Sequence, residues 1–368
     1  MLKAYKYRIY PNKNQKEIFD KHFGACRFIY NWGLNHKLVT YEKDKRSLSE
    51  FDINNMIPGL KKIHVWLNEV NSQSLQRSIG NMDSAFKKFF KEKTGFPKFK
   101  SRKNPVQSFQ IPQHYTVNFD NNMIKLPKIK EPIKARLHRM FDGKMKIATV
   151  SKTTTGKYYI SILVENGQEV PKKVDIDNVM GIDVGLNHFA ILSNGEKIDN
   201  EKYLKMSIQY LQVLQQRLSR KQKGSNNWNK QKLQVAKLHE KIVNQRNDFQ
   251  HKLSLRLISE NQAIAIESLN IKGMVKNHCL AQAISDVSWG SFIEKLQYKA
   301  DWYGKTVIQI GQFEPSSKLC HVCGYKNIGL KLHHRKWTCS DCNTVHDRDI
   351  NAAINIKNIA FNTVGTTA

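Results

Sequence analysis

Val-Met-Gly-Ile-Asp-Val-Gly-Leu-Asn-His-Phe-Ala-Ile-Leu, residues 179–192, is the stretch that decides the fold. Apolar residues surround a single carboxylate, Asp183, and two glycines. The pattern predicts a buried strand, a tight turn and a second strand that returns antiparallel to the first. A carboxylate on a buried strand is unfavourable unless it is paired or binds a metal ion. Gly181 and Gly185 leave room for backbone or a ligand to come close.

Two other stretches place acidic residues at the edge of an element. In residues 263–269, a run of β-type residues ends in Glu267. Residues 346–353 place Asp347 and Asp349 just before a predicted helix. A single acidic residue more often has a surface or capping role. The three stretches taken together instead suggest carboxylates that converge on divalent cations, which prefer oxygen ligands.

Two Cys-x-x-Cys pairs lie close together near the C-terminus, with fifteen residues between them. This spacing predicts a closed, structural zinc site with four thiolate ligands, Cys320, Cys323, Cys339 and Cys342. A redox dithiol is the weaker alternative, because two such pairs rarely occur by chance in one short hairpin. Histidines 321, 333, 334 and 346 are nearby alternative ligands, but four thiolates already complete a tetrahedral shell.

The composition points to a polyanionic partner. The 368 residues include 60 Lys and Arg against 31 Asp and Glu, for a net charge of +29. Such an excess suits nucleic acid, and an anionic membrane is the second choice. No stretch of about 18 apolar residues would span a membrane, and the first residues lack an apolar signal core. We expect a soluble cytoplasmic protein.

The N-terminal half alternates between strand and helix patterns. Residues 3–10 predict a half-buried strand, and helices are expected at 15–34, at 47–68 with a break at Pro58-Gly59, and at 71–93. Residues 84–103 then combine basic residues with phenylalanines, a mixture that suits phosphates and stacked bases. We expect Phe86, Phe89 and Phe90 to face the core, whereas nucleic-acid contact is an open alternative for Phe96, Lys98, Phe99 and Lys100.

Short β-type runs between residues 106 and 166 predict a small antiparallel barrel that the strand at 3–10 completes. Further along, residues 201–260 predict a helical hairpin, in which residues 201–252 hold 12 Lys or Arg and 3 acidic residues. A solvated basic face is the ordinary explanation of such a pattern. In a chain this basic we favour a groove for RNA or a hybrid duplex, with Arg217, Arg220 and Lys221 among its contacts.

The order Gly-Ile-Asp-Val-Gly, Ile-Glu-Ser-Leu and Asp-Arg-Asp-Ile-Asn-Ala-Ala resembles the split RuvC nuclease domain of TnpB proteins, which insertion sequences encode and which are related to type V CRISPR effectors. The resemblance implies an RNase H-like fold with Asp183, Glu267 and Asp349 as ligands of Mg²⁺ or Mn²⁺. Asp347 is a rival for the third position, but the resemblance places that ligand at Asp349, so Asp347 would support the site or cap the helix. For Arg348 and Asn351, support of the site and contact with phosphate both stay open.

The resemblance also implies the activity of an RNA-guided DNA endonuclease. A guide RNA derived from the transposon would pair with one strand of a double-stranded DNA target, while the protein reads a short flanking motif. Gln76, Arg77 and the loop at 96–103 are our candidates for that motif. A nuclease-inactive, guide-dependent repressor and a transposase that acts on transposon ends are the two alternatives.

The expected organisation is an α+β multidomain protein. Residues 1–10 and 104–175 would form the wedge-type barrel, into which a helical recognition lobe at 11–103 is inserted. Residues 176–318 and 344–368 would form the RuvC-like domain, and residues 319–343 its zinc-binding hairpin.

Overall fold

Two units make up the chain, Met1–Gln168 and Glu169–Ala368. The computed structural model describes residues 1–312, 314–331 and 333–365, without the side chains of the last two. Within this described part, no helix has the length and apolar character needed to cross a membrane.

The first unit is built on one antiparallel sheet of seven strands in the order β2-β6-β7-β1-β5-β4-β3. The predicted N-terminal strand pairs with β7 on one side and β5 on the other, so both ends of this unit meet in the sheet. The sequence patterns did not indicate β5. The strands are β1 (Leu2–Tyr10), β2 (Gln107–Ile111), β3 (Thr116–Asn118), β4 (Met123–Lys125), β5 (Ile133–Arg136), β6 (Lys144–Lys152) and β7 (Tyr158–Glu165).

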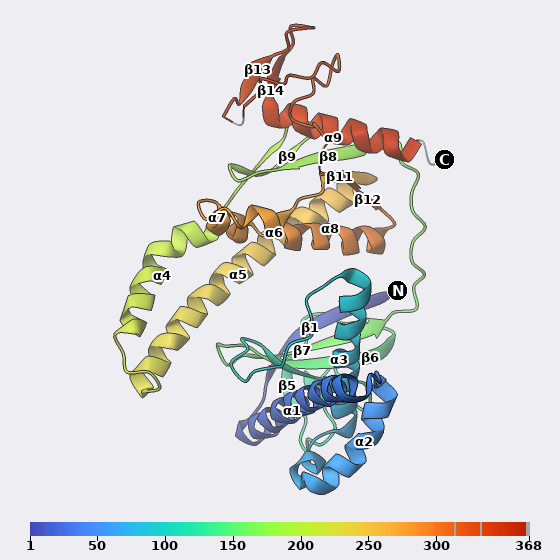
Figure 1. Cartoon of the computed structure of the whole chain (residues 1–368), viewed down its shortest axis with the longest axis vertical. Coiled ribbons are helices and arrows are strands. Elements are labelled where there is room, and N and C mark those ends of the chain that lie inside the picture. The colour runs from blue at the N-terminus through green and yellow to red at the C-terminus, as the bar shows by residue number, and fades with distance from the viewer. Residues whose placement is uncertain (313, 332, 366–368) are drawn as a thin grey trace. The chain divides into compact units, whose positions relative to one another are not determined.

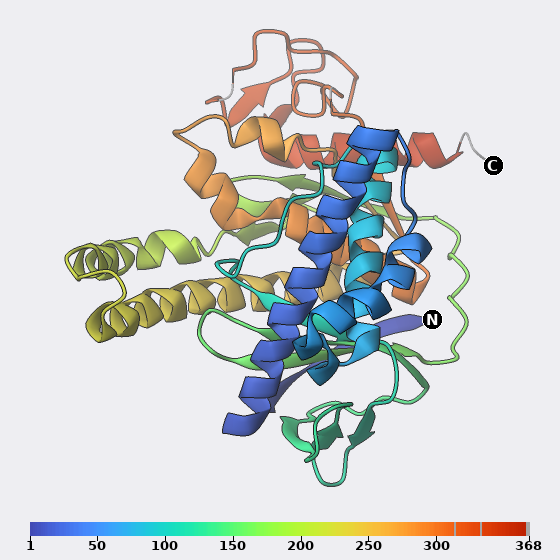
Figure 2. The ribbon, with the colours of Figure 1, turned by 60° about the horizontal axis from the view of Figure 1, so that its bottom comes forward.

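Helices of the first unit lie between β1 and β2 in the sequence. They are α1 (Lys13–Asp44), α2 (Glu50–Ile63), the short 3₁₀ helix Val65–Glu69 and α3 (Ser72–Glu92), and Figure 2 shows α1 and α3 side by side. The predicted break at Pro58-Gly59 is wrong, because α2 continues through Pro58. Ile53, Ile57 and Leu60 are buried on both sides of the proline, and this packing outweighs the lost backbone hydrogen bond.

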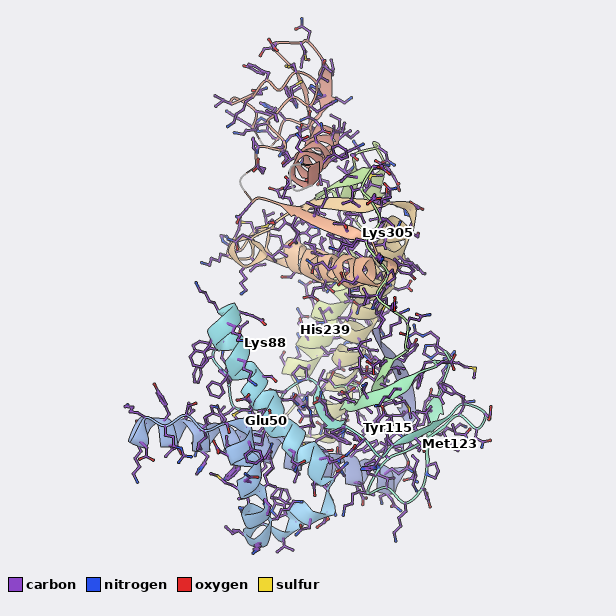
Figure 3. All side chains as sticks on the ribbon, turned by 90° about the vertical axis from the view of Figure 1, so that its right-hand side faces the viewer. Glu50, Lys88, Tyr115, Met123, His239 and Lys305 are labelled. Atoms are coloured by element: carbon purple, nitrogen blue, oxygen red, sulfur yellow. The ribbon has the colours of Figure 1, made fainter. Side chains whose placement is uncertain are left out.

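The C-terminal part of α3 carries the predicted aromatic stripe, and only part of it enters the core. Phe86 is buried and Phe89 half-buried, but Phe90 is 74% exposed, so its expected core position is wrong. Phe96 packs edge-on against Phe86 and Phe89, with ring centroids 5.5 and 5.3 Å apart. Figure 3 shows the side chains at this end of α3, where Lys88 is labelled.

The second unit holds a mixed sheet of five strands in the order β10-β9-β8-β11-β12. The antiparallel β8–β9 pair confirms the prediction for residues 179–192, while β11 and β12 run parallel to β8 and to each other. The edge strand β10 was not expected. The strands are β8 (Val179–Val184), β9 (His188–Leu192), β10 (Lys197–Asp199), β11 (Ala263–Glu267) and β12 (Thr306–Ile310).

Helices cover both faces of this sheet (Figure 1). α9 (Arg348–Gly365) lies on one face, and α5 (Asn226–Glu260) with α8 (Trp289–Tyr303) on the other. α4 (Tyr203–Ser219) and α5 form the predicted helical hairpin, which extends away from the sheet (Figure 1). Two short helices, α6 (Ile271–Met274) and α7 (Ala281–Val287), complete the layer with α8.

Gly181 is the point where α9 comes closest to the sheet. A Cβ atom at this position would lie 2.0 Å from the carbonyl oxygen of Ala353 and 2.8 Å from the amide nitrogen of Lys357, both backbone atoms of α9. No side chain other than hydrogen fits such a gap, so the predicted close approach at this glycine is confirmed.

We expect Gly181→Ala to lower the free energy of unfolding by about 3 kcal/mol, the upper end of the usual cost of overpacking, because backbone atoms cannot move aside as a flexible side chain does. Chemical denaturation followed by circular dichroism measures this change. Gly290→Ala in α8 is the matched control, since its new Cβ would meet only the end of Ile271 at 3.4 Å. Equal stability of the two variants would contradict the close packing of α9.

Candidate metal centres

Asp183 and Glu267 stand side by side at the ends of two parallel strands. Ile182 of β8 pairs with Ile266 of β11, so the next residue of each strand, the acidic one, points to the same face. This is also the face of Gly181, two residues before Asp183, and therefore the face that α9 covers. Both carboxylates are half-buried.

Asp349 reaches the same place from α9. It lies one helical turn before Ala353, whose carbonyl contacts Gly181, so the helix sets Asp349 beside Asp183. Burial, and after it the negative charges of Asp349 and Glu267, raise the pKa of Asp183 to about 7, while two arginines oppose this shift. Burial also raises the pKa of Glu267. The three predicted carboxylates thus belong to one electrostatic cluster.

Arg335 is a partner of this cluster that the sequence did not single out. It precedes β13 (Lys336–Thr338), and its Nη1 donates to both carboxylate oxygens of Asp349 at 3.3 and 3.1 Å. Asp349 is therefore turned toward a guanidinium. Among the described residues, the ligand atoms of the three acids do not form a group within 4.8 Å of one another, whereas the four cysteines do.

Asp347 caps α9, which was one of its predicted alternatives. Its Oδ1 accepts hydrogen bonds from the amides of Asp349 and Ile350, which caps α9, and its Oδ2 pairs with Lys197 at 2.6 Å. Burial alone would raise the pKa of Asp347, but the Lys197 ammonium and the amides outweigh it and hold the pKa below its usual value. A carboxylate with all these partners is a helix cap.

The four cysteines form the predicted cluster. The sulfur atoms of Cys320 and Cys342 are 3.7 Å apart, and those of Cys323 and Cys339 are 3.5 Å apart. A tetrahedral Zn²⁺ with Zn–S bonds of about 2.3 Å places its sulfurs about 3.8 Å apart. The donor set and its spacing therefore fit a structural zinc ion, which would leave no position open for catalysis.

The two cysteine knuckles have matching backbones. The residue after the second cysteine of each knuckle has a positive φ, 78° at Gly324 and 55° at Asn343. Its backbone amide donates to the carbonyl of the first cysteine of the same knuckle at 3.0 Å. Asn343 is thus compatible with the tight turn, because asparagine tolerates a left-handed φ better than most residues. His346 Nε2 also lies 3.1 Å from Cys320 Sγ, beside the thiolate shell.

The predicted nucleic-acid contacts are mostly on the surface. In the first unit Gln76, Lys98 and Phe99 are exposed, and Arg77 is half-buried. Lys100 has its Nζ 4.0 Å from the centre of the Tyr30 ring, and its backbone pairs with Asn31. In the second unit Arg217 and Arg220 are exposed at the end of α4, and Lys221 follows them half-exposed. No structural feature assigns these residues a nucleic-acid contact by itself.

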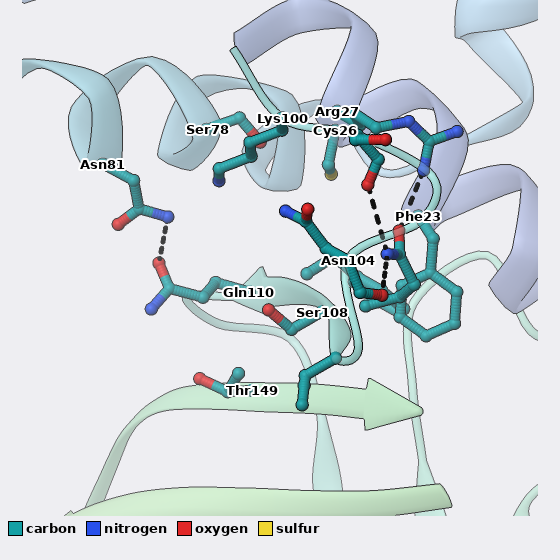
Figure 4. A pocket seen from close by; sticks show the side chains of 14 residues that line it. Phe23, Cys26, Arg27, Ser78, Asn81, Lys100, Asn104, Ser108, Gln110 and Thr149 are labelled. Carbon is teal, nitrogen blue, oxygen red and sulfur yellow. Dashed lines mark hydrogen bonds between the residues drawn. The ribbon is translucent and has the colours of Figure 1, made fainter. Parts of the chain in front are cut away.

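A polar pocket of about 140 Å³ lies in the first unit between α1, α3, β2 and the loop that contains Lys100. Amides, hydroxyls and two cations line it, and Asn81 Nδ2 donates to Gln110 Oε1 at 3.1 Å across one end (Figure 4). Arg27 from α1 and Lys100 supply the positive charge. The sequence patterns identified Lys100 but missed Arg27, Asn81 and Gln110, which only the fold brings together.

Three family models match segments of the chain. They are described as "Probable transposase" at residues 161–278, "Cas12f1-like, TNB domain" at 289–356 and "Helix-turn-helix domain" at 1–46. The second match contains the cysteine cluster and the start of α9. In this structure the third segment holds β1 and α1.

Relatives with 30% identity or more align along almost the whole chain. A "Putative RNA-guided DNA endonuclease" of Streptomyces pristinaespiralis is 36% identical over 96% of this chain and 88% of its own length. InsQ of Escherichia coli K12, with the same description, is 30% identical over 96% of this chain and 91% of its own length. The chain belongs to this family of insertion-sequence proteins, the TnpB family.

The fold is also found in solved structures. The Cas12f1 protein in a complex with guide RNA and target DNA superimposes with a TM-score of 0.57 over 94% of this chain and 83% of that one, at 17% identity. At this level of identity the likeness concerns the fold alone.

We expect Cys320→Ser and Cys342→Ser to lose zinc and to destabilise the hairpin that leads into Asp349, because metal binding at such a site is part of the folding free energy. Elemental analysis of purified protein should give about one zinc per chain for the native protein and much less for each variant. Cys279→Ser, at an exposed cysteine outside the cluster, is the matched control. A native protein without zinc would contradict the assignment.

Proposed function

We propose that the protein is an RNA-guided DNA endonuclease of an insertion sequence, which cuts double-stranded DNA next to a short flanking motif. The observation that carries the proposal is the cluster of Asp183, Glu267 and Asp349, which come from three elements far apart in the sequence and share one face of the sheet. It is supported by the relatives from Streptomyces pristinaespiralis and Escherichia coli, which are named as putative RNA-guided DNA endonucleases.

In this proposal the three carboxylates hold divalent cations, Mg²⁺ or Mn²⁺, since oxygen ligands suit hard cations. Such ions, when bound, activate water and stabilise the leaving oxygen of a phosphodiester. The chain's own contribution is placement: β8 and β11 fix two carboxylates in register, and the contact of α9 with Gly181 fixes the third. Arg335 and Arg348 supply positive charge beside them.

A finer assignment of the fold belongs to the same proposal. We assign an RNase H-like, RuvC-type core to the second unit, supported by its mixed five-stranded sheet with helices on both faces and by the likeness to Cas12f1. We assign the role of the wedge-type barrel to the antiparallel sheet of the first unit, and that of the recognition lobe to α1, α2 and α3.

Nucleic acid would contact both units. The exposed arginines at the end of α4 suit the backbone of a guide RNA, because basic residues on an extended hairpin reach phosphates without blocking the sheet. The polar pocket of the first unit suits base edges of the flanking motif. Asn81, Gln110 and Arg27 offer the amide and guanidinium groups that recognise bases. Gln76 and Arg77 lie on the same helix as Asn81.

Two alternatives stay in competition. A nuclease-inactive repressor would bind guide and target without cutting, but the presence of all three acids favours cleavage. A transposase would join DNA ends, and one family model is described as "Probable transposase". The third acid, however, follows a cysteine hairpin in an Asp-Ile-Asn-Ala-Ala context, which favours the nuclease. A strand-joining assay with transposon ends distinguishes the transposase.

We expect Asp183→Ala, Glu267→Ala and Asp349→Ala each to abolish DNA cleavage and to leave guide-dependent DNA binding nearly unchanged. Binding depends on base pairing and on contacts between basic residues and phosphates, to which clustered acids contribute nothing favourable. Each acid, in contrast, would supply a ligand of the catalytic cations. Cleavage and gel-shift assays with Mg²⁺ and a matched guide measure the two properties.

Two further variants serve as controls for this experiment. Asp301→Ala removes an exposed acid from α8, on the other face of the sheet, and should cut normally. Asp347→Ala should keep substantial activity at a stability cost of about 1 kcal/mol, the usual value of a helix cap. Normal cutting by Asp183→Ala would refute the nuclease. An active Asp349→Ala together with an inactive Asp347→Ala would exchange the roles of these two residues.

We expect reversal of Arg217, Arg220 and Lys221 to glutamate to weaken RNA binding and to flatten its salt dependence. Three lost phosphate contacts change the slope of log K against log salt by about 2 for a single strand. Filter binding of the co-purifying RNA across salt concentrations measures the slope. Reversal of the exposed Lys13, Lys16 and Lys43 of α1 changes the net charge equally and is the control. An unchanged slope would identify an ordinary solvated face.

A further inference from the structure

Asn351 is a fully buried polar residue. It lies on α9, two residues after Asp349, and is 0% exposed. Its Oδ1 accepts hydrogen bonds from the backbone amide and the Nδ1 of His321, at 3.1 and 2.9 Å, and its Nδ2 donates to the carbonyl of Leu319 at 2.7 Å. All three partners belong to the first cysteine knuckle.

The two residues that Asn351 binds are the neighbours of Cys320, one of the four cluster thiolates. The carboxamide of Asn351 therefore forms hydrogen bonds with the residues on both sides of a zinc ligand. Asn355 lies one turn further along α9 and is 2% exposed. Its Nδ2 donates to the carbonyls of Leu319 and Ser316 at 2.6 and 2.7 Å, so it contacts the chain on only one side of Cys320.

The second knuckle reaches α9 by a separate route. β13 pairs with β14 (Val345–Asp347), the amide of Arg348 donates to the carbonyl of Arg335 at 2.9 Å, and the Arg335 side chain binds Asp349. Asp349 is thus held through Asn351 by the first knuckle and through Arg335 by the second. A zinc ion that joins the two knuckles would fix both attachments at once.

We infer that Asn351 is a positioning residue that couples the zinc hairpin to the acidic cluster, so that loss of zinc weakens the binding of a divalent cation at Asp183, Glu267 and Asp349. This inference rests on the proposed function, since it takes the acids as cation ligands. Such coupling is reciprocal by thermodynamic linkage: if zinc raises the affinity of the acidic cluster for a divalent cation, that cation raises the affinity for zinc by the same factor. Residues that orient metal ligands commonly contribute a large factor to affinity.

The test measures Mn²⁺ binding to the full-length protein by isothermal titration calorimetry, with zinc content determined in parallel. Asp183→Ala should abolish the Mn²⁺ site and so identify it. Asn351→Ala should keep its zinc, because the thiolates are untouched, and bind Mn²⁺ on the order of tenfold more weakly. Asn355→Ala, the matched control, should lose less affinity.

A double-mutant cycle separates coupling from simple stability. Cys342→Ser should weaken Mn²⁺ binding in the native background and have a smaller further effect beside Asn351→Ala, where only the attachment through Arg335 is left, whereas a purely structural asparagine predicts independent effects. If Asn351→Ala does not fold, native protein stripped of zinc by a chelator and dialysed gives the same test. Its Mn²⁺ affinity should fall while the circular dichroism of its helices persists.

The outcomes are distinct. Unchanged Mn²⁺ affinity in zinc-containing Asn351→Ala, or in the zinc-stripped protein, would overturn the coupling and leave the proposed nuclease intact. A native protein without any Asp183-dependent Mn²⁺ site would overturn the proposed function and the coupling together.

Discussion

The contact between Gly181 and the backbone of α9 is the constraint on which the acidic cluster depends. A helix normally rests on a sheet through side chains of both, but here a carbonyl of the helix approaches the strand where no side chain intervenes. This close approach fixes the height and the rotation of α9 over β8. Asp349, one turn before the contact, and Asp183, two residues after it, are consequently neighbours whatever the intervening chain does.

Bringing three carboxylates together is unfavourable, and the second unit compensates this cost locally. The neighbouring charges and burial raise the pKa of Asp183, while Arg335 and Arg348 oppose that shift. Asp347 is compensated separately by Lys197 and by the amides at the start of α9. The basic residues near the cluster thus have a stabilising role in the protein itself, apart from any role toward a bound polyanion.

The sequence predicted what depends on local patterns. Apolar residues around Asp183 located β8 and β9, and the spacing of four cysteines located the cluster, because each signal lies within one short stretch of sequence. The resemblance to a family, and not the spacing, identified which acids belong together. The catalytic roles of those acids and the boundaries of the expected domains stay predictions. Long-range packing explains why α2 runs through Pro58, and no local rule could have shown it.

Arg335 and Asn351 show most clearly where sequence reasoning stops. Arg335 lies between two cysteine pairs, and Asn351 lies in an Asp-Ile-Asn-Ala-Ala motif. The sequence around them does not show whether they hold other residues in place or lie on the surface. Their partners lie across a loop that the cysteine cluster and the β13–β14 pair close. Because Asp349 directly follows that hairpin, a metal ion that orders the loop also reduces the conformational freedom of the third carboxylate. A structural metal ion beside Asp349 therefore lowers the entropic cost of positioning this carboxylate, which lies far from Asp183 and Glu267 in the sequence.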